Sequence, residues 1–116
     1  MTRDVPIVVS RVIDGDSFFC EDVDLGFDVH LAKQSFRLAR INAWELKDAK
    51  GPEAKAFFED CLARAGGSAE LRKFRSKRDK YRRWLCEIWA NDCCVNDLLL
   101  DAGLAVPAYG LEEEEC

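Results

Sequence analysis

The chain has 116 residues, of which 48% are hydrophobic and 34% charged, and its formal net charge is -5. This length and composition exclude a disordered segment and favour one domain with a single core. The few apolar residues before Ser10 are too short for a signal peptide or a membrane span, so we expect a cytoplasmic protein with no membrane attachment. The six cysteines contain no Cys-x-x-Cys pair and His30 is the single histidine, which disfavours a zinc site and favours reduced thiols.

The first forty residues carry the signals of β-strands. Residues 5–12 are rich in β-branched side chains, the Asp-Gly-Asp sequence at 14–16 is a turn signal, and residues 17–25 resume the apolar pattern. Gly26 marks a bend or bulge of the kind that closing a small barrel requires. Residues 27–41 then form a third extended run.

Beyond this point the hydrophobic period changes to that of a helix. Pro52 suits a first helical turn, and apolar residues recur at three- and four-residue steps until the two glycines at 66–67. Residues 69–74 and 84–90 have the pattern of two further strands, joined across a basic segment. The Asn-Asp pair at 91–92 is the turn that ends the second of them.

A second, short amphipathic helix is expected over residues 95–102, where Gly103 ends its apolar stripe. Five strands with a helix after the third are the order of an oligonucleotide/oligosaccharide-binding (OB) barrel. We therefore predict an α+β fold, mainly β: a five-stranded OB-fold barrel with two or three short helices. Residues 1–110 would form this single domain, and residues 111–116 an acidic C-terminal tail.

The net charge understates how well the chain could bind a polyanion. Four of the 22 acids form the run 112–115, and without them 17 cations face 18 acids. Residues 72–83 hold eight Lys and Arg side chains and one acid, so they form a local cationic surface that suits phosphates. The aromatic residues in or beside this segment, Phe74, Tyr81 and Trp84, suit a single-stranded polynucleotide, although at least half of such side chains belong to the core.

Three short motifs occur in a fixed order along the chain. The first is Val12-Ile-Asp-Gly-Asp-Ser17, the second is Phe36-Arg-Leu-Ala-Arg-Ile-Asn-Ala-Trp-Glu45 followed by Gly51-Pro-Glu-Ala54, and the third is Asp79-Lys-Tyr-Arg-Arg83 with Val95-Asn96 and Gly103-Leu-Ala105. Together they resemble the staphylococcal nuclease family of metal-dependent nucleases, over most of the chain. The insertion at 24–27 further resembles phage-encoded members.

The resemblance implies a metal site. It marks Asp16 as a direct ligand, Asp14 as the group that orients Asp16 and bound waters, and the Ala43 carbonyl as another ligand. Asn42 stands where the family typically has a second metal-binding aspartate, so we expect the site to be kept with weaker affinity. Calcium is the expected ion, with magnesium or manganese as alternatives. Trp44 occupies the family's usual proline, and without the resemblance the Asp-Gly-Asp sequence would indicate only a hairpin turn.

The resemblance also implies catalytic roles for three charged residues. Glu45 matches the glutamate that activates the attacking water, although a lone Glu is more often a solvated loop acid. Arg37 and Arg83 match two arginines that clamp the phosphate, because the guanidinium fork fits two phosphate oxygens. Arg37 alternates with Phe36 and Leu38 along a strand, so we expect it to face away from the core.

Three further residues match positions that contact a terminal phosphate or stack on a base, namely Lys80, Tyr81 and Tyr109. Lys33 and Arg40 are interpreted as ordinary surface charge. The resemblance implies hydrolysis of DNA and RNA in flexible or single-stranded regions, on the 5′-oxygen side and leaving 3′-phosphate ends. Nothing in the sequence indicates an obligate protein partner.

The alternative is a catalytically weakened OB-fold module that binds nucleic acid or a protein. Asn42 would then be the first sign of a decayed site. The two aspartates of the turn, the two arginines and Glu45 argue against decay, because each is intact at its position in the motifs.

Overall fold

The structure, a computed structural model, describes residues 5–44, 48–78 and 83–107. In this part of the chain a seven-stranded sheet has the order β1-β6-β7-β4-β3-β2, with β8 added against β7. Its strands are β1 (Val5–Val8), β2 (Arg11–Asp14), β3 (Ser17–Gly26), β4 (Val29–Leu38), β6 (Ser68–Arg78), β7 (Trp84–Ala90) and β8 (Cys93–Cys94). A two-stranded sheet pairs β5 (Ile41–Ala43) with β9 (Ala105–Pro107), and the helices are α1 (Gly51–Arg64) and α2 (Val95–Asp101).

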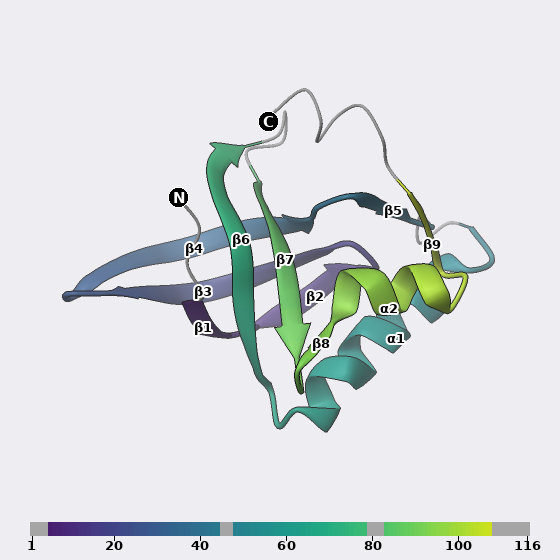
Figure 1. Cartoon of the computed structure of the whole chain (residues 1–116), viewed down its shortest axis with the longest axis horizontal. Helices are drawn as coiled ribbons and strands as arrows, with labels where there is room; N and C mark the ends of the chain where they lie inside the picture. The colour runs from purple at the N-terminus through teal and green to yellow at the C-terminus, as the bar shows by residue number, and fades with distance from the viewer. Residues whose placement is uncertain (1–4, 45–47, 79–82, 108–116) are drawn as a thin grey trace.

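The main sheet curls into half a barrel. Figure 1 shows β6 and β7 running across the long β3–β4 ribbon, with α1 and α2 side by side near one end of it. The pairing of β4 with β7 is parallel and the other pairings in this sheet are antiparallel. The predicted α+β fold, mainly β and of the OB type, is confirmed. Neither helix of the described residues is long and apolar enough to cross a membrane.

The predicted first strand is split in two, which is the main difference from the five-strand pattern. Its first half, β1, pairs with β6, whereas its second half, β2, pairs with β3. Ser10 N–H donates to the Phe19 carbonyl at 2.9 Å, so the second ladder starts at the bend itself. The chain therefore bends at Ser10 so that its two halves pair with different strands of the curled sheet. The short strands β5, β8 and β9 are additional to the five strands that the sequence indicates.

Two tight turns have a left-handed backbone, which Asp28, Asn91 and Asp92 tolerate better than other non-glycine residues do. Phe27 and Asp28 have φ values of 55° and 61° and connect Gly26 to Val29. The prediction that Phe27 begins the third strand is therefore wrong, because Phe27 lies in the turn. The register shifts just before Gly26, as predicted for a bulge there. The predicted turn at 91–92 is confirmed, again with positive φ at both residues.

Aromatic residues of the core pack α1 against the main sheet. Phe18 of β3 stacks on Phe36 of β4 with ring centroids 5.0 Å apart, and Phe58 of α1 meets Phe18 edge-on at 5.8 Å. Ala54 and Leu62 extend the buried face of α1 one turn to either side of Phe58. The helix therefore has the predicted apolar stripe, and it packs against β2, the strand that leads into the Asp-Gly-Asp turn.

The five described cysteines are free thiols. Cys20, Cys86 and Cys94 are buried, Cys61 is half-buried and Cys93 is exposed. Burial raises the pKa of the Cys20 thiol to about 12, so this side chain acts as a small apolar core residue.

Candidate active site

The turn between β2 and β3 fixes the Asp14 carboxylate. Asp14 Oδ1 accepts hydrogen bonds from the Asp16 backbone N–H at 3.1 Å and from the Ser17 hydroxyl at 2.6 Å. Leu38 N–H donates to the Asp16 carbonyl at 2.8 Å, which joins the turn to the end of β4. Ser17 is buried, so its hydroxyl holds Asp14 without competition from bulk water.

Gly15 lets this turn approach its neighbours closely. A Cβ at this position would lie 2.6 Å from the Ala54 methyl of α1 and 2.7 Å from the Ala43 methyl of β5. Both distances are shorter than any carbon–carbon contact tolerates, so only glycine fits. The turn, the start of α1 and the end of β5 thus meet at one point.

Asp16 is mostly buried and accepts the Ala43 backbone N–H at 3.0 Å through Oδ2. Burial and the hydrogen bond with the neighbouring Asp14 carboxyl raise its pKa to about 6, which Ala43 N–H and Arg37 offset in part. Burial also acts to raise the pKa of Asp14, but hydrogen bonds from Asp16 and Ser17 and the charge of Arg83 outweigh it and lower that pKa. The two carboxyl groups therefore interact strongly, and a nearby cation would favour ionisation of both.

Arg37 lies directly across the β3–β4 ladder from Ser17. It points away from the apolar core as predicted, yet it is buried and not part of an exposed surface. Its guanidinium donates from Nη2 to the Ile41 carbonyl at 3.1 Å and to Asn42 Oδ1, and Nη2 lies 3.9 Å from Asp16 Oδ2. Backbone and side-chain acceptors thus hold this cation beside the carboxylate pair.

These groups line one cavity of about 330 Å³. Its lining residues are Asp14, Asp16, Arg37, Asn42, Ala43, Trp44 and Arg83. The structure therefore brings together every predicted metal and catalytic residue that it describes. The other four predicted site residues lie outside the described residues: Glu45, Lys80, Tyr81 and Tyr109.

The oxygen atoms around this cavity are of the type that hard cations prefer. Among the lining residues, Asp14 and Asp16 carry carboxylates, Asn42 carries an amide oxygen and Ala43 has a backbone carbonyl. Over residues 5–44, 48–78 and 83–107 no three His, Cys, Asp or Glu side chains are placed so that they could hold a metal ion, so a metal would also depend on the amide and carbonyl oxygens. Asn42 Oδ1 accepts from Arg37 in this structure, and ligation would exchange that hydrogen bond for the ion.

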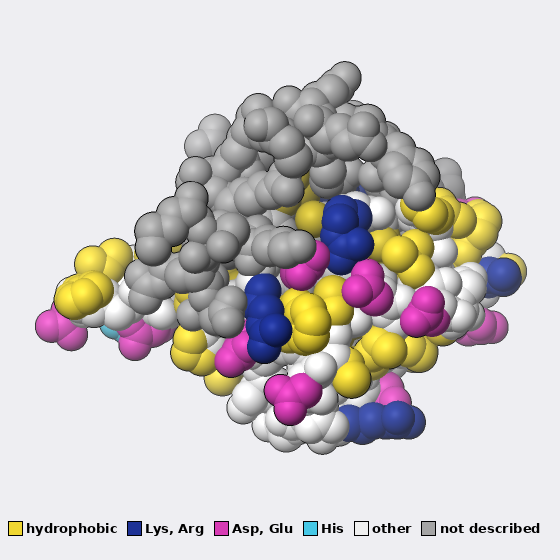
Figure 2. All heavy atoms as spheres, viewed as in Figure 1, with side chains coloured by type: hydrophobic (Ala, Val, Ile, Leu, Met, Phe, Trp, Pro, Cys, Tyr) yellow, Lys and Arg dark blue, Asp and Glu magenta, His cyan; other side chains and the backbone are white. Residues whose placement is uncertain are grey.

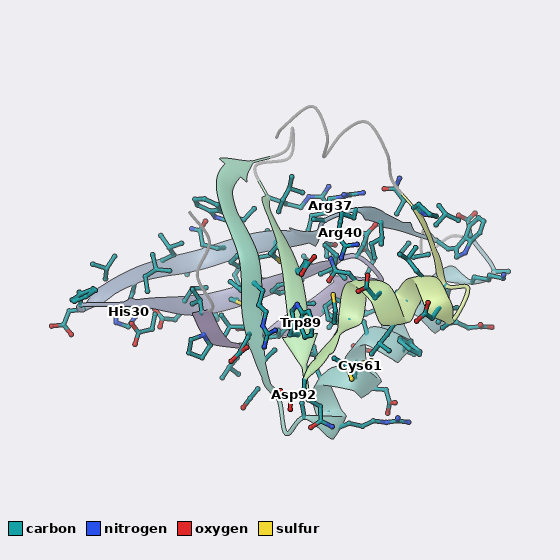
Figure 3. The ribbon with its side chains drawn as sticks, in the orientation of Figure 1. His30, Arg37, Arg40, Cys61, Trp89 and Asp92 are labelled. Carbon is teal, nitrogen blue, oxygen red and sulfur yellow. The ribbon has the colours of Figure 1, made fainter. Side chains whose placement is uncertain are left out.

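Arg40 was interpreted from the sequence as ordinary surface charge, but the structure places it in two ion pairs. Its Nη2 lies 2.9 Å from the buried Glu87 and 3.2 Å from Asp97. Figure 3 shows Arg37 and Arg40 close together near the same end of β4. The buried acid on β7 was the sequence signal for this pairing, because an acid inside an apolar strand pattern requires a partner.

Asn96 at the start of α2 stabilises the chain behind Arg37. Its Nδ2 donates to the Ala39 carbonyl at 2.9 Å and to the Cys86 carbonyl at 3.2 Å, and its Oδ1 accepts Ile88 N–H at 3.1 Å. The side chain is fully buried with each hydrogen-bonding group satisfied. It joins α2, β7 and the β4–β5 turn.

Basic and acidic side chains alternate over β6, β7 and α2 on the face shown in Figure 2. The ion pairs of Arg40 with Glu87 and Asp97, and of Arg72 with Glu70, belong to this pattern. Such mixed charge does not favour a polyanion. The predicted cationic surface of residues 72–83 is carried mostly by side chains that the structure does not describe.

Comparison with known protein families identifies one match. The model of a family described as staphylococcal nuclease homologue matches residues 35–115. This range includes Arg37, Asn42 and Arg83, and it begins after the Asp-Gly-Asp turn. No curated protein matches the chain.

Proposed function

The chain belongs to the staphylococcal nuclease homologue family, and we propose that it is a divalent-metal-dependent endonuclease that hydrolyses phosphodiester bonds of DNA and RNA. Calcium is the proposed ion. The observation that supports this most is the single cavity shared by the Asp14–Asp16 pair and by Arg37 and Arg83. Carboxylates for a cation and guanidinium groups for a phosphate are the complementary halves of a phosphodiesterase site.

The oxygen donors fit a divalent ion held by Asp16, Asn42 Oδ1 and the Ala43 carbonyl. The strongly interacting carboxyl pair supports this assignment, because two adjacent acids in a mostly buried turn gain most from a cation. When bound, the ion would draw charge from the phosphate and orient water. Asp14, fixed by Ser17, would orient the Asp16 carboxylate and the waters around it.

Arg37 and Arg83 would donate to the non-bridging oxygens of the phosphate. Charge on these oxygens grows as the five-coordinate transition state forms, so fixed cations stabilise it more than the ground state. Arg37 is well suited to this role, because the Ile41 carbonyl accepts from its guanidinium and restricts its orientation whether or not Asn42 binds the ion. Arg83 lies just before β7 and lines the cavity, and its charge helps to lower the pKa of Asp14.

Glu45 is proposed to accept the proton of the attacking water. It lies outside the described residues, and the support for this role is its position next to Trp44, which lines the cavity. The reaction needs such a carboxylate within one water of the phosphorus, and Glu45 is the residue that the family resemblance assigns to this role. The leaving 5′-oxygen would take its proton from solvent or from a cavity side chain.

The alternative function is a weakened module that binds nucleic acid without cleaving it. The observation in its favour is the hydrogen bond from Arg37 to Asn42, because it occupies a proposed metal ligand and a proposed phosphate clamp at once. Under this alternative Arg37→Ala would weaken binding and no turnover would occur in any divalent ion.

A nuclease assay across calcium, magnesium and manganese tests the proposal. The natural protein should cleave DNA and RNA with added ion and stop in excess chelator, and Glu45→Ala should cleave far more slowly while still binding the substrate. Full activity in excess chelator would contradict metal dependence. Absence of cleavage in all three ions, with binding retained, would establish the alternative.

A further inference from the structure

Trp44 lies between two cavities. It follows β5 directly, is 39% exposed, and lines the cavity that holds Asp16 and Arg37. It also lines a second cavity of about 280 Å³, together with Asp48, Ala49 and Lys50. Trp44 therefore lies between the proposed phosphate site and a neighbouring hollow.

The second cavity has the chemistry of a nucleotide site. The Lys50 ammonium lies 5.7 Å from the centre of the Trp44 ring, close enough for a cation–π contact. Lys50 is the residue before α1, where the backbone is anchored by Gly51 N–H donating to the Asp48 carbonyl at 3.0 Å. An aromatic face, one cation and one carboxylate, Asp48, thus surround a hollow beside the phosphate site.

The other two tryptophans show how Trp44 differs. Trp84 Nε1 donates to Gln34 Oε1 at 2.7 Å, and Trp89 Nε1 donates to Glu87 Oε1 at 3.2 Å while Arg72 covers its ring at 4.1 Å. Figure 3 shows Trp89 on β7, away from Arg37. Within the described residues Trp44 Nε1 has no hydrogen-bond acceptor, so its N–H can serve a ligand.

We propose that the cavity formed by Trp44, Asp48, Ala49 and Lys50 binds an unpaired nucleobase of the substrate, next to the phosphate held by Arg37 and Arg83. This subsite rests on the proposed function. Phosphates and bases alternate along a polynucleotide, so a strand with one phosphate in the first cavity must place an adjacent base close by. The base stacks on the indole, Lys50 attracts the next phosphate, and Asp48 accepts from an exocyclic amino group.

The subsite selects single strands. A base in a duplex is stacked on both faces and paired at its edge, so it reaches the indole only after leaving the helix, at a cost in free energy. On this proposal the preference for single-stranded substrates depends on Trp44, which stands where the family resemblance expects a proline.

Binding of two labelled oligonucleotides, measured by fluorescence anisotropy in excess chelator so that no cleavage occurs, tests the subsite. One is a short single-stranded oligodeoxynucleotide of mixed sequence, and the other is an abasic strand with the same number of phosphates. We expect Trp44→Ala to raise the Kd of the first about tenfold and to leave the second unchanged, since base–aromatic stacking contributes about this much. Trp44→Phe should recover part of the loss, and Lys50→Ala should weaken both strands.

Two controls separate the possible results. Trp89→Phe, on β7 and outside the lining of both cavities, should bind both strands as the natural protein does, and circular dichroism should show each variant folded. An equal effect of Trp44→Ala on both strands, no effect on either, or no binding by the natural protein would overturn the subsite. Cleavage with calcium together with any of these results would leave the proposed function standing, whereas base-dependent binding without cleavage in any ion would overturn the proposed function alone.

Discussion

The two ends of the β3–β4 ribbon differ in what an acid–base pair can do. At one end Arg37 lies 3.9 Å from Asp16, with side chains 8% and 14% exposed. At the other end His30 lies 2.9 Å from Asp22, with side chains 46% and 56% exposed. Figure 3 shows His30 and Arg37 at opposite ends of the same ribbon. Water and salt screen the exposed His30–Asp22 pair more than the buried Arg37–Asp16 pair.

Burial gives the Arg37 end its fixed geometry. Ser17 and Phe36 beside it are buried, and backbone carbonyls hold the guanidinium. The far end is a two-residue turn whose Phe27 side chain is 95% exposed. The same ladder thus supports a preorganised site where the core packs against it and a solvated hairpin where its side chains are exposed.

The largest difference between the two ends should appear in catalysis. Arg37→Ala should lower kcat about 10²- to 10³-fold, the usual loss when one fixed donor to the transition state is removed. His30→Ala, at the far end of the ribbon, should leave kcat unchanged. Steady-state cleavage of a labelled oligonucleotide at saturating calcium measures both, and equal effects of the two substitutions would break the comparison.

The next largest difference between the two ends should appear in the free energy of unfolding, because only the site end is tightly packed. Gly15→Ala would force a methyl group against Ala43 and Ala54, so we expect a loss of about 1–3 kcal/mol in the free energy of unfolding. Asp28→Gly, at φ 61° in the exposed turn, should be close to neutral because glycine adopts this backbone readily. Urea unfolding of both variants measures the contrast, and an unchanged midpoint for Gly15→Ala would show that the turn is not held against α1 and β5.

A smaller effect is expected from restoring charge at the site. Asn42→Asp should lower the calcium concentration for half-maximal activity about tenfold, because ligand charge tunes calcium affinity over orders of magnitude. Calorimetric titration with calcium checks the same change without turnover. If the variant binds calcium no more tightly than the natural protein, Asn42 is not a ligand.

The smallest effect concerns His30. Its hydrogen bond with Asp22 raises the pKa of the imidazole above its ordinary value, and the charges of Asp22 and Asp24 add to this. A raised folded-state pKa contributes stability that is fully present below the unfolded pKa, about 6.5, and is lost as pH rises through the folded value. Asp22→Asn should lower the His30 pKa in an NMR titration, and an unchanged value would show that the pair does not form.

Much of the fold could be predicted from local signals. Proline and glycine mark the ends of α1, the glycine at 26 marks the bulge, and the Asn-Asp pair marks a turn, since each depends on its own backbone preference. The bend at Ser10 could not be predicted in this way. It arises because β1 and β2 pair with strands that are distant from each other in the sequence.

The sequence predicted which residues form the site but not how they are arranged in space. Family resemblance points to Asp14, Asp16, Arg37 and Arg83, and the structure places all four around one cavity. The close approach at Gly15 was not foreseen, because it depends on methyl groups from two distant elements. Burial of Arg37 and its hydrogen bond to Asn42 likewise depend on how the β4–β5 turn folds back over the strand end.

Cleavage of a labelled single-stranded oligonucleotide by the natural protein and by Asp16→Asn, each with calcium and with excess chelator, tests the central claim most directly. We predict cleavage by the natural protein in calcium alone, and a loss of most activity in Asp16→Asn at the calcium concentration that saturates the natural protein. Undiminished cleavage by Asp16→Asn, or by the natural protein in chelator, would contradict a metal-dependent site at this end of the ribbon.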